Sequence, residues 1–96
     1  MAERPVLDHR STALLHISRK FRERWGINLT SFKRRHIIGQ IWNGAPSLPG
    51  SGSCKIYLVV VDGKKVAVVF DPVQVALYTV LPADDKRYKA LLERYE

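Results

Sequence analysis

Apolar residues follow a helical period in the first 44 positions of the chain. A first helix is predicted to begin after Asp8 or Ser11, either of which can cap exposed N–H groups, and to end at Gly26. Its buried face is marked by four apolar residues spaced three or four apart, Leu14, Ile17, Phe21 and Trp25. On the side away from that face we expect four polar residues, His16, Arg19, Lys20 and Glu23.

A second helix is predicted to follow Thr30, another suitable capping residue, and to end at Asn43-Gly44. Its apolar side is expected to consist of Ile37, Ile38, Ile41 and Trp42. Both tryptophans of the chain therefore lie on apolar helical faces, and we expect them to pack in the core.

The period changes to that of strands after residue 54. Two β-branched and aromatic runs, 55–61 and 65–70, flank Asp62-Gly63, a pair that favours a tight hairpin turn. A third strand is predicted over 75–81 and is stopped by Pro82. Either Asp84 or Asp85 can cap a short final helix.

These elements predict one α+β domain over residues 1–96. Two N-terminal helices would pack on a three- to four-stranded antiparallel sheet, followed by a short C-terminal helix. Residues 1–9 are expected to be flexible, and residues 45–53, which are rich in Pro, Gly and Ser, are expected to form a loop between the helical and sheet parts. We expect Val60 to face inward, so that an aspartate there would unfold the domain.

The positive charge is concentrated in the first half of the sequence. The formal net charge is +7, and residues 1–44 carry nine Lys or Arg against three acidic residues, a net +6. Such a field attracts polyanions, nucleic acid above all, although surface charge can also serve solubility alone.

Several kinds of site are not expected. Cys54 is the single cysteine, which favours a reducing compartment such as the cytoplasm. The three histidines are scattered along the chain, so we expect neither a metal site nor a cofactor. The longest apolar run, 56–61, is too short to span a membrane, and the N-terminus has no apolar segment typical of a signal peptide.

The residues His16, Lys20 and Arg24 stand four apart and form one stripe on the first helix. Cleavage of RNA without metal needs a base for the 2′-hydroxyl proton, an acid for the leaving 5′-oxygen and cations for the charge at phosphorus. Histidine titrates near neutral pH, and Lys and Arg supply fixed charge. The competing interpretation is that His16 is a solvated surface residue.

Four segments, "HISRKFRERWGI", "IIGQIWNG", "YLVVVDGKKVAVVFD" and "YTVLP", together resemble a family of small bacterial and phage domains. That family carries a His-Ala-x-x-Arg-x-x-x-Arg-Gly-Ile helix and is similar to the barnase–EndoU–colicin D–RelE class of metal-independent ribonuclease toxins. The resemblance spans roughly residues 12–82. It implies catalytic roles for His16, Lys20, Arg24 and Thr79.

The chain departs from the family pattern at three positions. Lys20 replaces the usual arginine, which keeps the charge but does not allow bidentate binding of phosphate. Ile17 stands where a small residue is usual, and Trp25 is inserted before Gly26.

Nucleic-acid contacts are expected from five further residues, Arg19, Lys33, Arg34, Arg35 and Tyr78. Because neighbouring strand residues face opposite sides, only one of Tyr78 and Thr79 can share a side with the helical stripe. Both can also be ordinary strand residues.

The sequence thus predicts an RNA-binding protein that could be a toxin-type endoribonuclease, monomeric or weakly dimeric, with an inhibitor or host protein as a further partner. One alternative is a non-catalytic adaptor that binds nucleic acid or a host protein. A third is a structural protein that pairs through a sheet edge.

Overall fold

The computed structural model describes residues 9–95, and side chains over residues 15–94. The expected flexibility of residues 1–9 lies outside this range, apart from His9, at which the first helix begins, and so does the predicted burial of the Leu14 side chain. The elements in chain order are α1 (His9–Trp25), α2 (Ser31–Trp42), β1 (Ser47–Pro49), β2 (Lys55–Val61), β3 (Lys64–Asp71), β4 (Ala76–Val80) and α3 (Lys86–Tyr95).

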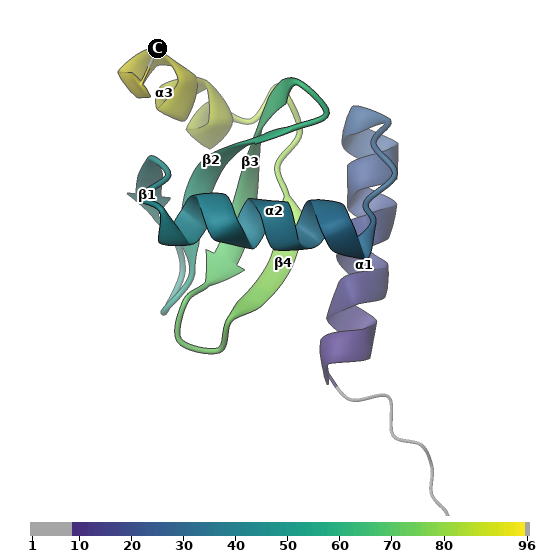
Figure 1. Ribbon diagram of the computed structural model, residues 1–96. Coiled ribbons are helices and arrows are strands. Elements are labelled where there is room, and N and C mark those ends of the chain that lie inside the picture. The colour runs from purple at the N-terminus through teal and green to yellow at the C-terminus, as the bar shows by residue number, and fades with distance from the viewer. Residues whose placement is uncertain (1–8, 96) are drawn as a thin grey trace, which may run out of the picture.

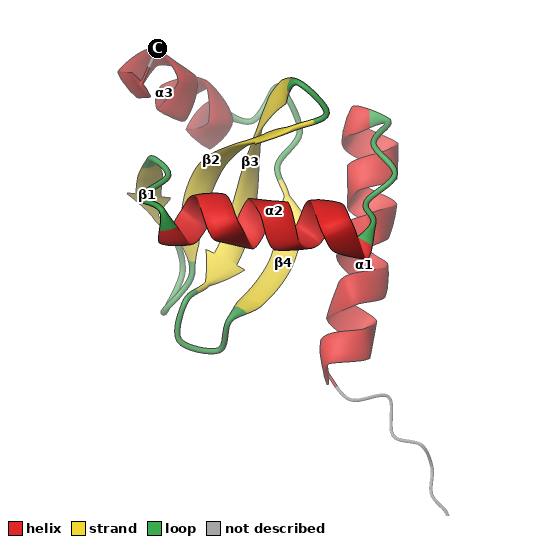
Figure 2. Cartoon of the chain, in the orientation of Figure 1, coloured by secondary structure: helices red, strands yellow, loops and turns green. Residues whose placement is uncertain are grey.

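The four strands form one antiparallel sheet in the order β1-β2-β3-β4. Helix α2 crosses one face of the sheet, α1 runs alongside β4, and α3 lies behind the sheet (Figure 1). Figure 2 distinguishes the helices, strands and loops in the same orientation. The predicted α+β fold is confirmed. The expected loop over 45–53 contains the short strand β1, in which Ser47 pairs with Tyr57 of β2.

The sheet is buried on both faces, so the chain has two apolar clusters. The cluster under α1 and α2 includes Ile17, Phe21, Ile37 and Ile41 together with Val59, Val68 and Phe70 of the sheet. The cluster on the other face joins α3 to the sheet through Ile56, Leu58, Ala67, Leu81, Tyr88 and Leu91. A strand that is covered on both faces has apolar residues at successive positions. This explains why apolar and polar residues do not alternate along β2 and β3.

The local signals predicted from sequence are found where they were expected. Gly26 has φ +64°, and Ile27 N–H donates to the Phe21 carbonyl at 3.3 Å, which closes α1. The Thr30 hydroxyl accepts from Lys33 N–H at 3.1 Å and caps α2. Asp62 and Gly63 both have positive φ, 52° and 75°, as the hairpin turn requires.

Two expectations about the core were wrong. Trp42 is 57% exposed, because as the last residue of α2 it reaches only the edge of Phe70, with ring centroids 5.7 Å apart. Val60 is 48% exposed. Strand alternation puts Val60 on the same face as Ile56 and Leu58, and α3 covers those two residues and leaves Val60 open.

A side-chain amide completes the edge of the sheet beyond β1. Gln40 Nε2 donates to the Val60 carbonyl at 2.9 Å, and Val60 N–H donates to Gln40 Oε1 at 2.8 Å. Two residues before Val60 in β2, Leu58 N–H donates to the Pro46 carbonyl at 2.8 Å. The backbone of β2 is therefore paired past the end of its three-residue neighbour, and α2 is fixed to the sheet.

Gln40→Met keeps the shape of the side chain and removes both hydrogen bonds to Val60. We expect the free energy of unfolding to fall by about 1–2 kcal/mol, the usual effect of removing such bonds at a partly exposed site. Urea unfolding followed by circular dichroism measures this decrease. The control is Arg35→Met on the same helix, because Arg35 is exposed and its side chain makes no hydrogen bond within the described part of the chain. Equal midpoints for the two variants would contradict the proposed role of Gln40 at this edge.

Candidate nucleic-acid interface

The predicted stripe of His16, Lys20 and Arg24 lies along one flank of α1. Of the four residues expected on the side away from the core, Arg19 and Glu23 are exposed, whereas His16 and Lys20 are not fully so. His16 and Lys20 are half-buried, because their neighbours Ile17 and Phe21 are fully buried against the sheet. Only Arg24 of the three is exposed. The stripe therefore borders the contact between α1 and β4.

Two of the α1 cations share an acidic neighbour. Lys20 Nζ lies 3.4 Å from Glu23 Oε1, and Arg19 Nε lies 4.0 Å from Glu23 Oε2. Ion pairs at partly exposed positions of a helix stabilise it only slightly. Both cations therefore stay available to a phosphate, with Glu23 as an internal competitor.

Arg24 has a structural contact that the sequence did not reveal. Its Nη1 donates to the Val80 carbonyl at 2.6 Å, and the next residue, Trp25, donates from Nε1 to the Leu81 carbonyl at 2.8 Å. These two bonds tie the end of α1 to the outer edge of the sheet. A guanidinium has five N–H donors, so Arg24 keeps free donors for a ligand.

The His16 side chain makes no hydrogen bond or ion pair with any residue in the described range. The residue is half-buried, so part of it is open to solvent. The α1 flank thus brings together one unpartnered imidazole and two cations, the minimum that the predicted chemistry needs.

The polar residues of β4 make no hydrogen bond to the stripe in the described range. Val69 pairs with Thr79 and Phe70 pairs with Leu77, so Tyr78 is the extra residue of a β-bulge. Val69 packs against the α3-side cluster, and its partner Thr79 therefore lies on the α3 face of the sheet, opposite the face that α2 covers. The Tyr78 hydroxyl donates to Gln74 Oε1 at 3.2 Å. No hydrogen bond joins Thr79 to His16, Lys20 or Arg24 among residues 15–94.

The basic cluster at the start of α2 divides into paired and unpaired cations. Lys33 Nζ lies 2.8 Å from Asp62 Oδ2 and 3.1 Å from the Asn28 carbonyl, and so links α2 to the β2–β3 turn. Arg34 and Arg35 have no hydrogen bond or ion pair from their side chains in the part of the chain that the structure describes. Arg35 is also exposed. These two arginines are the least constrained of the predicted binding residues.

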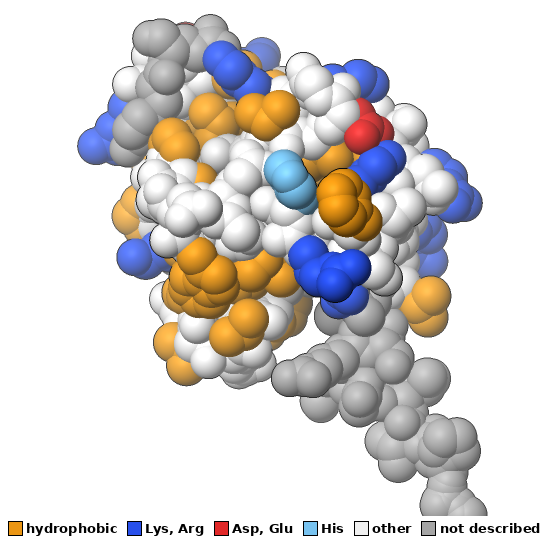
Figure 3. Space-filling model, viewed as in Figure 1, with side chains coloured by type: hydrophobic (Ala, Val, Ile, Leu, Met, Phe, Trp, Pro, Cys, Tyr) orange, Lys and Arg blue, Asp and Glu red, His pale blue; other side chains and the backbone are white. Residues whose placement is uncertain are grey.

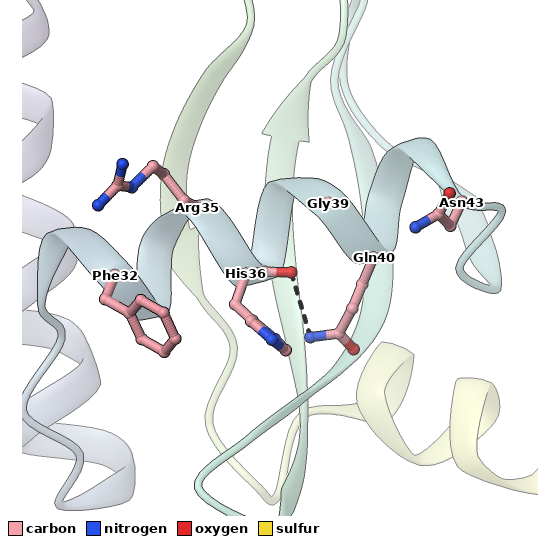
Figure 4. Close-up of a pocket in the computed structure, with 6 residues that line it drawn as sticks. All are labelled: Phe32, Arg35, His36, Gly39, Gln40 and Asn43. Atoms are coloured by element: carbon pink, nitrogen blue, oxygen red, sulfur yellow. Dashed lines mark hydrogen bonds between the residues drawn. The ribbon is translucent and has the colours of Figure 1, made fainter.

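The outward side of α2 carries an aromatic feature that was not predicted from the sequence. Phe32 is 68% exposed, and its ring lies against the exposed ring of His36 with centroids 5.7 Å apart. Both rings project from the same side of α2, and Arg35 projects from another side (Figure 4). A hollow of about 430 Å³ is lined by Phe32, Arg35, His36, Gly39, Gln40 and Asn43. Two features of the sequence could have indicated this surface. Phe32 is an aromatic residue out of phase with the buried Ile37 and Ile41, and Gly39 is a glycine inside a helix.

The face that carries α2 shows hydrophobic and basic side chains, with a histidine near its centre and an acidic side chain close by (Figure 3). Most of the charged side chains beside the hydrophobic ones are basic. Such a mixed surface suits a ligand that has both flat apolar parts and negative groups.

The buried carboxylate of Asp71 is a structural group. Ser53 Oγ donates to Asp71 Oδ2 at 2.8 Å, and the backbone N–H groups of Val73 and Gln74 donate to Oδ1. The Ser53 bond, with the two backbone bonds, holds the pKa of Asp71 below its usual value. Nearby, burial and the Asp71 charge raise the pKa of the Cys54 thiol. Cys54 is therefore kept as a thiol, and a nucleophilic role for it is disfavoured.

The described residues contain neither a metal cluster nor a membrane-spanning helix. Within that part of the chain, no three His, Cys, Asp or Glu side chains lie closely enough together to hold a metal ion. None of its helices is long and apolar enough to cross a membrane. Comparisons with protein-family models, with curated proteins and with solved structures find no match to this chain. Kinship with the ribonuclease toxins stays a prediction, and the function has to be argued from charge and geometry.

Proposed function

We propose that this protein binds RNA in the cytoplasm, through contacts between the phosphate backbone and the cations of α1 and the first half of α2. The observation that carries the proposal is the charge of these two helices. From residue 15 to residue 42 the chain holds seven Lys or Arg and a single acidic residue, Glu23. A surface with this imbalance attracts a polyanion over a distance comparable to the Debye length.

The position of Arg34 and Arg35 also supports binding of an anion. Both lie in the first turns of α2, where the helix dipole disfavours cations, and neither is compensated by a partner in the described range. The protein thus keeps two mildly unfavourable charges free. A bound phosphate would neutralise both, and it would also lie near the positive end of the helix.

Pairing through a sheet edge is less well supported. The outer edge of β4 accepts a hydrogen bond from Arg24 of α1, and the residue after it accepts one from Trp25. The edge of β2 is paired with β1, Pro46 and Gln40, and the outer strand β1 has only three residues and ends in Pro49. Proline and short length are both features that prevent strand addition. A protein partner would have to use the basic helices instead.

Metal-independent RNA cleavage is the second candidate function. The specific observation that favours it is the unpartnered imidazole of His16 on the same flank as Lys20 and Arg24, within the range that the structure describes. Thr79, the fourth residue of the expected catalytic set, makes no hydrogen bond to the stripe in the described range and so adds no support. Binding therefore stands as the leading proposal, and cleavage is tested separately.

The double variant Arg34→Gln/Arg35→Gln tests the binding proposal. We expect it to weaken RNA binding on several unrelated sequences alike, because binding to phosphate carries no sequence information. The slope of log affinity against log salt should fall by about 0.7 for each phosphate of a single strand that the variant no longer neutralises. Fluorescence anisotropy with labelled oligoribonucleotides at several salt concentrations measures both effects.

The matched control is Lys86→Gln/Lys89→Gln on α3, which removes two exposed charges from the other face of the molecule. It should change the slope little. Equal decreases in the two double variants would show that charge attracts RNA diffusely and that no defined interface exists. If the unmutated protein binds no RNA at low salt, the proposal is wrong.

A further inference from the structure

We propose that the paired rings of Phe32 and His36 on α2 are a stacking platform for the unpaired bases of a single-stranded nucleic acid. This inference rests on the proposed function and names the form of nucleic acid that the basic helices bind. Single-stranded RNA and single-stranded DNA share the relevant chemistry, a flexible phosphate backbone with exposed bases.

The ring pair is open to solvent. Phe32 is 68% exposed, and its ring neighbour is His36, one turn further along the helix. The two ring planes are inclined by 38°, so they form a slightly bent surface and not a closed stack. An aromatic ring left open on a helix contributes little to folding, and stacking on a base would cover it.

The surface around the rings is hollowed on two sides. Phe32 and His36 line the hollow of about 430 Å³ along α2 and also a second hollow of about 320 Å³. The second hollow lies between α2 and the β2–β3 turn, and its wall includes the exposed side chain of Val60. The rings therefore stand between two recesses that are each open to a flat, partly apolar group.

Gly39 lines the first hollow and keeps it open. A Cβ built on Gly39 would meet no atom within 4 Å, so no packing requirement explains a glycine there. Its φ is not in the positive range either, and alanine would make the helix more stable. The missing side chain leaves the hollow open between the rings and Asn43, which lies one turn beyond. Asn43 is exposed and offers an amide that can donate to and accept from a base edge.

Cationic groups flank the aromatic surface. Arg35 lines the same hollow as the rings, and its side chain has no partner among the described residues. The carboxylate beside the second hollow, Asp62, is already ion-paired with Lys33 at 2.8 Å. A ligand at this place therefore meets aromatic surface together with positive charge. That combination fits bases linked by phosphates better than it fits an apolar or acidic peptide segment.

The test uses four labelled probes of equal length: single-stranded RNA, single-stranded DNA, double-stranded RNA, and an abasic ribose-phosphate chain. Phe32→Ala should weaken binding of the base-containing single strands about tenfold, in the range seen for removal of a stacking ring. It should leave binding of the duplex and the abasic chain unchanged. It should also leave the salt slope unchanged, because no cation is removed.

Two further substitutions at Phe32 separate stacking from mere apolar contact. Phe32→Tyr keeps an aromatic face and should bind like the unmutated protein, whereas Phe32→Leu should behave like Phe32→Ala. Trp42→Ala is the matched control, since Trp42 is an exposed ring on the same helix that lines neither hollow. A strand that carries 2-aminopurine reports stacking directly, and its fluorescence should fall on binding unless Phe32 has been replaced.

Gly39→Gln fills the hollow from inside the helix, where the new Cβ touches no neighbour. It should raise the thermal midpoint, or leave it unchanged, and still weaken single-strand binding several-fold.

If Phe32→Ala and Gly39→Gln both bind single strands as the unmutated protein does, the proposal of a stacking platform is wrong. In that case a lower salt slope for Arg34→Gln/Arg35→Gln would show that the backbone-binding proposal still holds. If no probe binds, the proposed function itself fails. Preference for RNA or for DNA among the single strands identifies the natural ligand.

Discussion

Val59→Asp is expected to leave no folded protein at about 25 °C, whereas the same substitution at the next residue, Val60→Asp, leaves the fold intact. Val59 is 1% exposed and lies in the cluster under α1 and α2, while Val60 is 48% exposed. An unpaired carboxylate in a small core costs several kcal/mol, comparable to the whole stability of about 5–15 kcal/mol of such a domain. At Val60 the carboxylate stays in water, and we expect a decrease of about 1 kcal/mol or less.

Thermal unfolding and dispersion of amide resonances distinguish these two outcomes. The pair is internally controlled, because both variants have the same charge, composition and strand. A folded Val59→Asp protein, or an unfolded Val60→Asp protein, would mean that the register of β2 is wrong by one residue. A slip of one residue exchanges the two faces of a strand.

The elements that sequence predicted well are those specified locally. Gly26 ends α1, Thr30 caps α2, and Asp62-Gly63 turns the hairpin, because each signal depends on a few adjacent residues and on the sign of φ. The face of Val60 could not be predicted in this way. Both faces of β2 are apolar, so alternation gives two equivalent answers, and only the limited reach of α3 decides between them.

The other differences between the predicted and the observed fold also depend on distant parts of the chain. Strand β1 lies in a segment rich in Pro and Gly, and it forms because β2 presents an open edge to it. The bulge at Tyr78 decides which face Thr79 occupies, and nothing in the local pattern marks it. Trp42 shows the limit of helical periodicity, because a residue at the end of a helix can point past the sheet that its face covers.

The sequence predicts which charged residues the candidate site contains, but it does not predict which residues they contact. The basic residues of α1 and α2 can be read directly from the sequence. The bond from Arg24 to Val80 and the ion pair of Lys33 with Asp62 join residues 56 and 29 positions apart, and they exist only in the folded chain. These interactions change the ranking of the candidates. Among the described residues of α2 they leave Arg34 and Arg35 as free cations, and they give Arg24 a structural role as well.

His16→Ala is expected to separate RNA cleavage from RNA binding. If the second candidate function is correct, the unmutated protein cleaves RNA in excess chelator and leaves 2′,3′-cyclic phosphate ends, the product of attack by the 2′-oxygen. The variant should then cleave about 100-fold more slowly or worse, the usual effect of removing a general acid or base. It should keep its RNA affinity, because Lys20 and the arginines of α2 remain. Gel analysis of end-labelled RNA measures the rate, and anisotropy measures the affinity.

The matched control for this prediction is His36→Ala, which removes the exposed histidine of α2 and leaves the α1 flank unchanged. At saturating RNA it should cleave at the unmutated rate, since His36 lies on the other helix against Phe32, where the proposed platform would affect affinity and not the proton transfers. Equal decreases in the two variants would indicate a contaminating nuclease or a general weakening of binding. If the unmutated protein leaves RNA intact from acid to alkaline pH, with and without magnesium, the cleavage candidate is wrong. His16 would then be one more polar residue on a binding helix, and the backbone-binding proposal would stand on the cations alone.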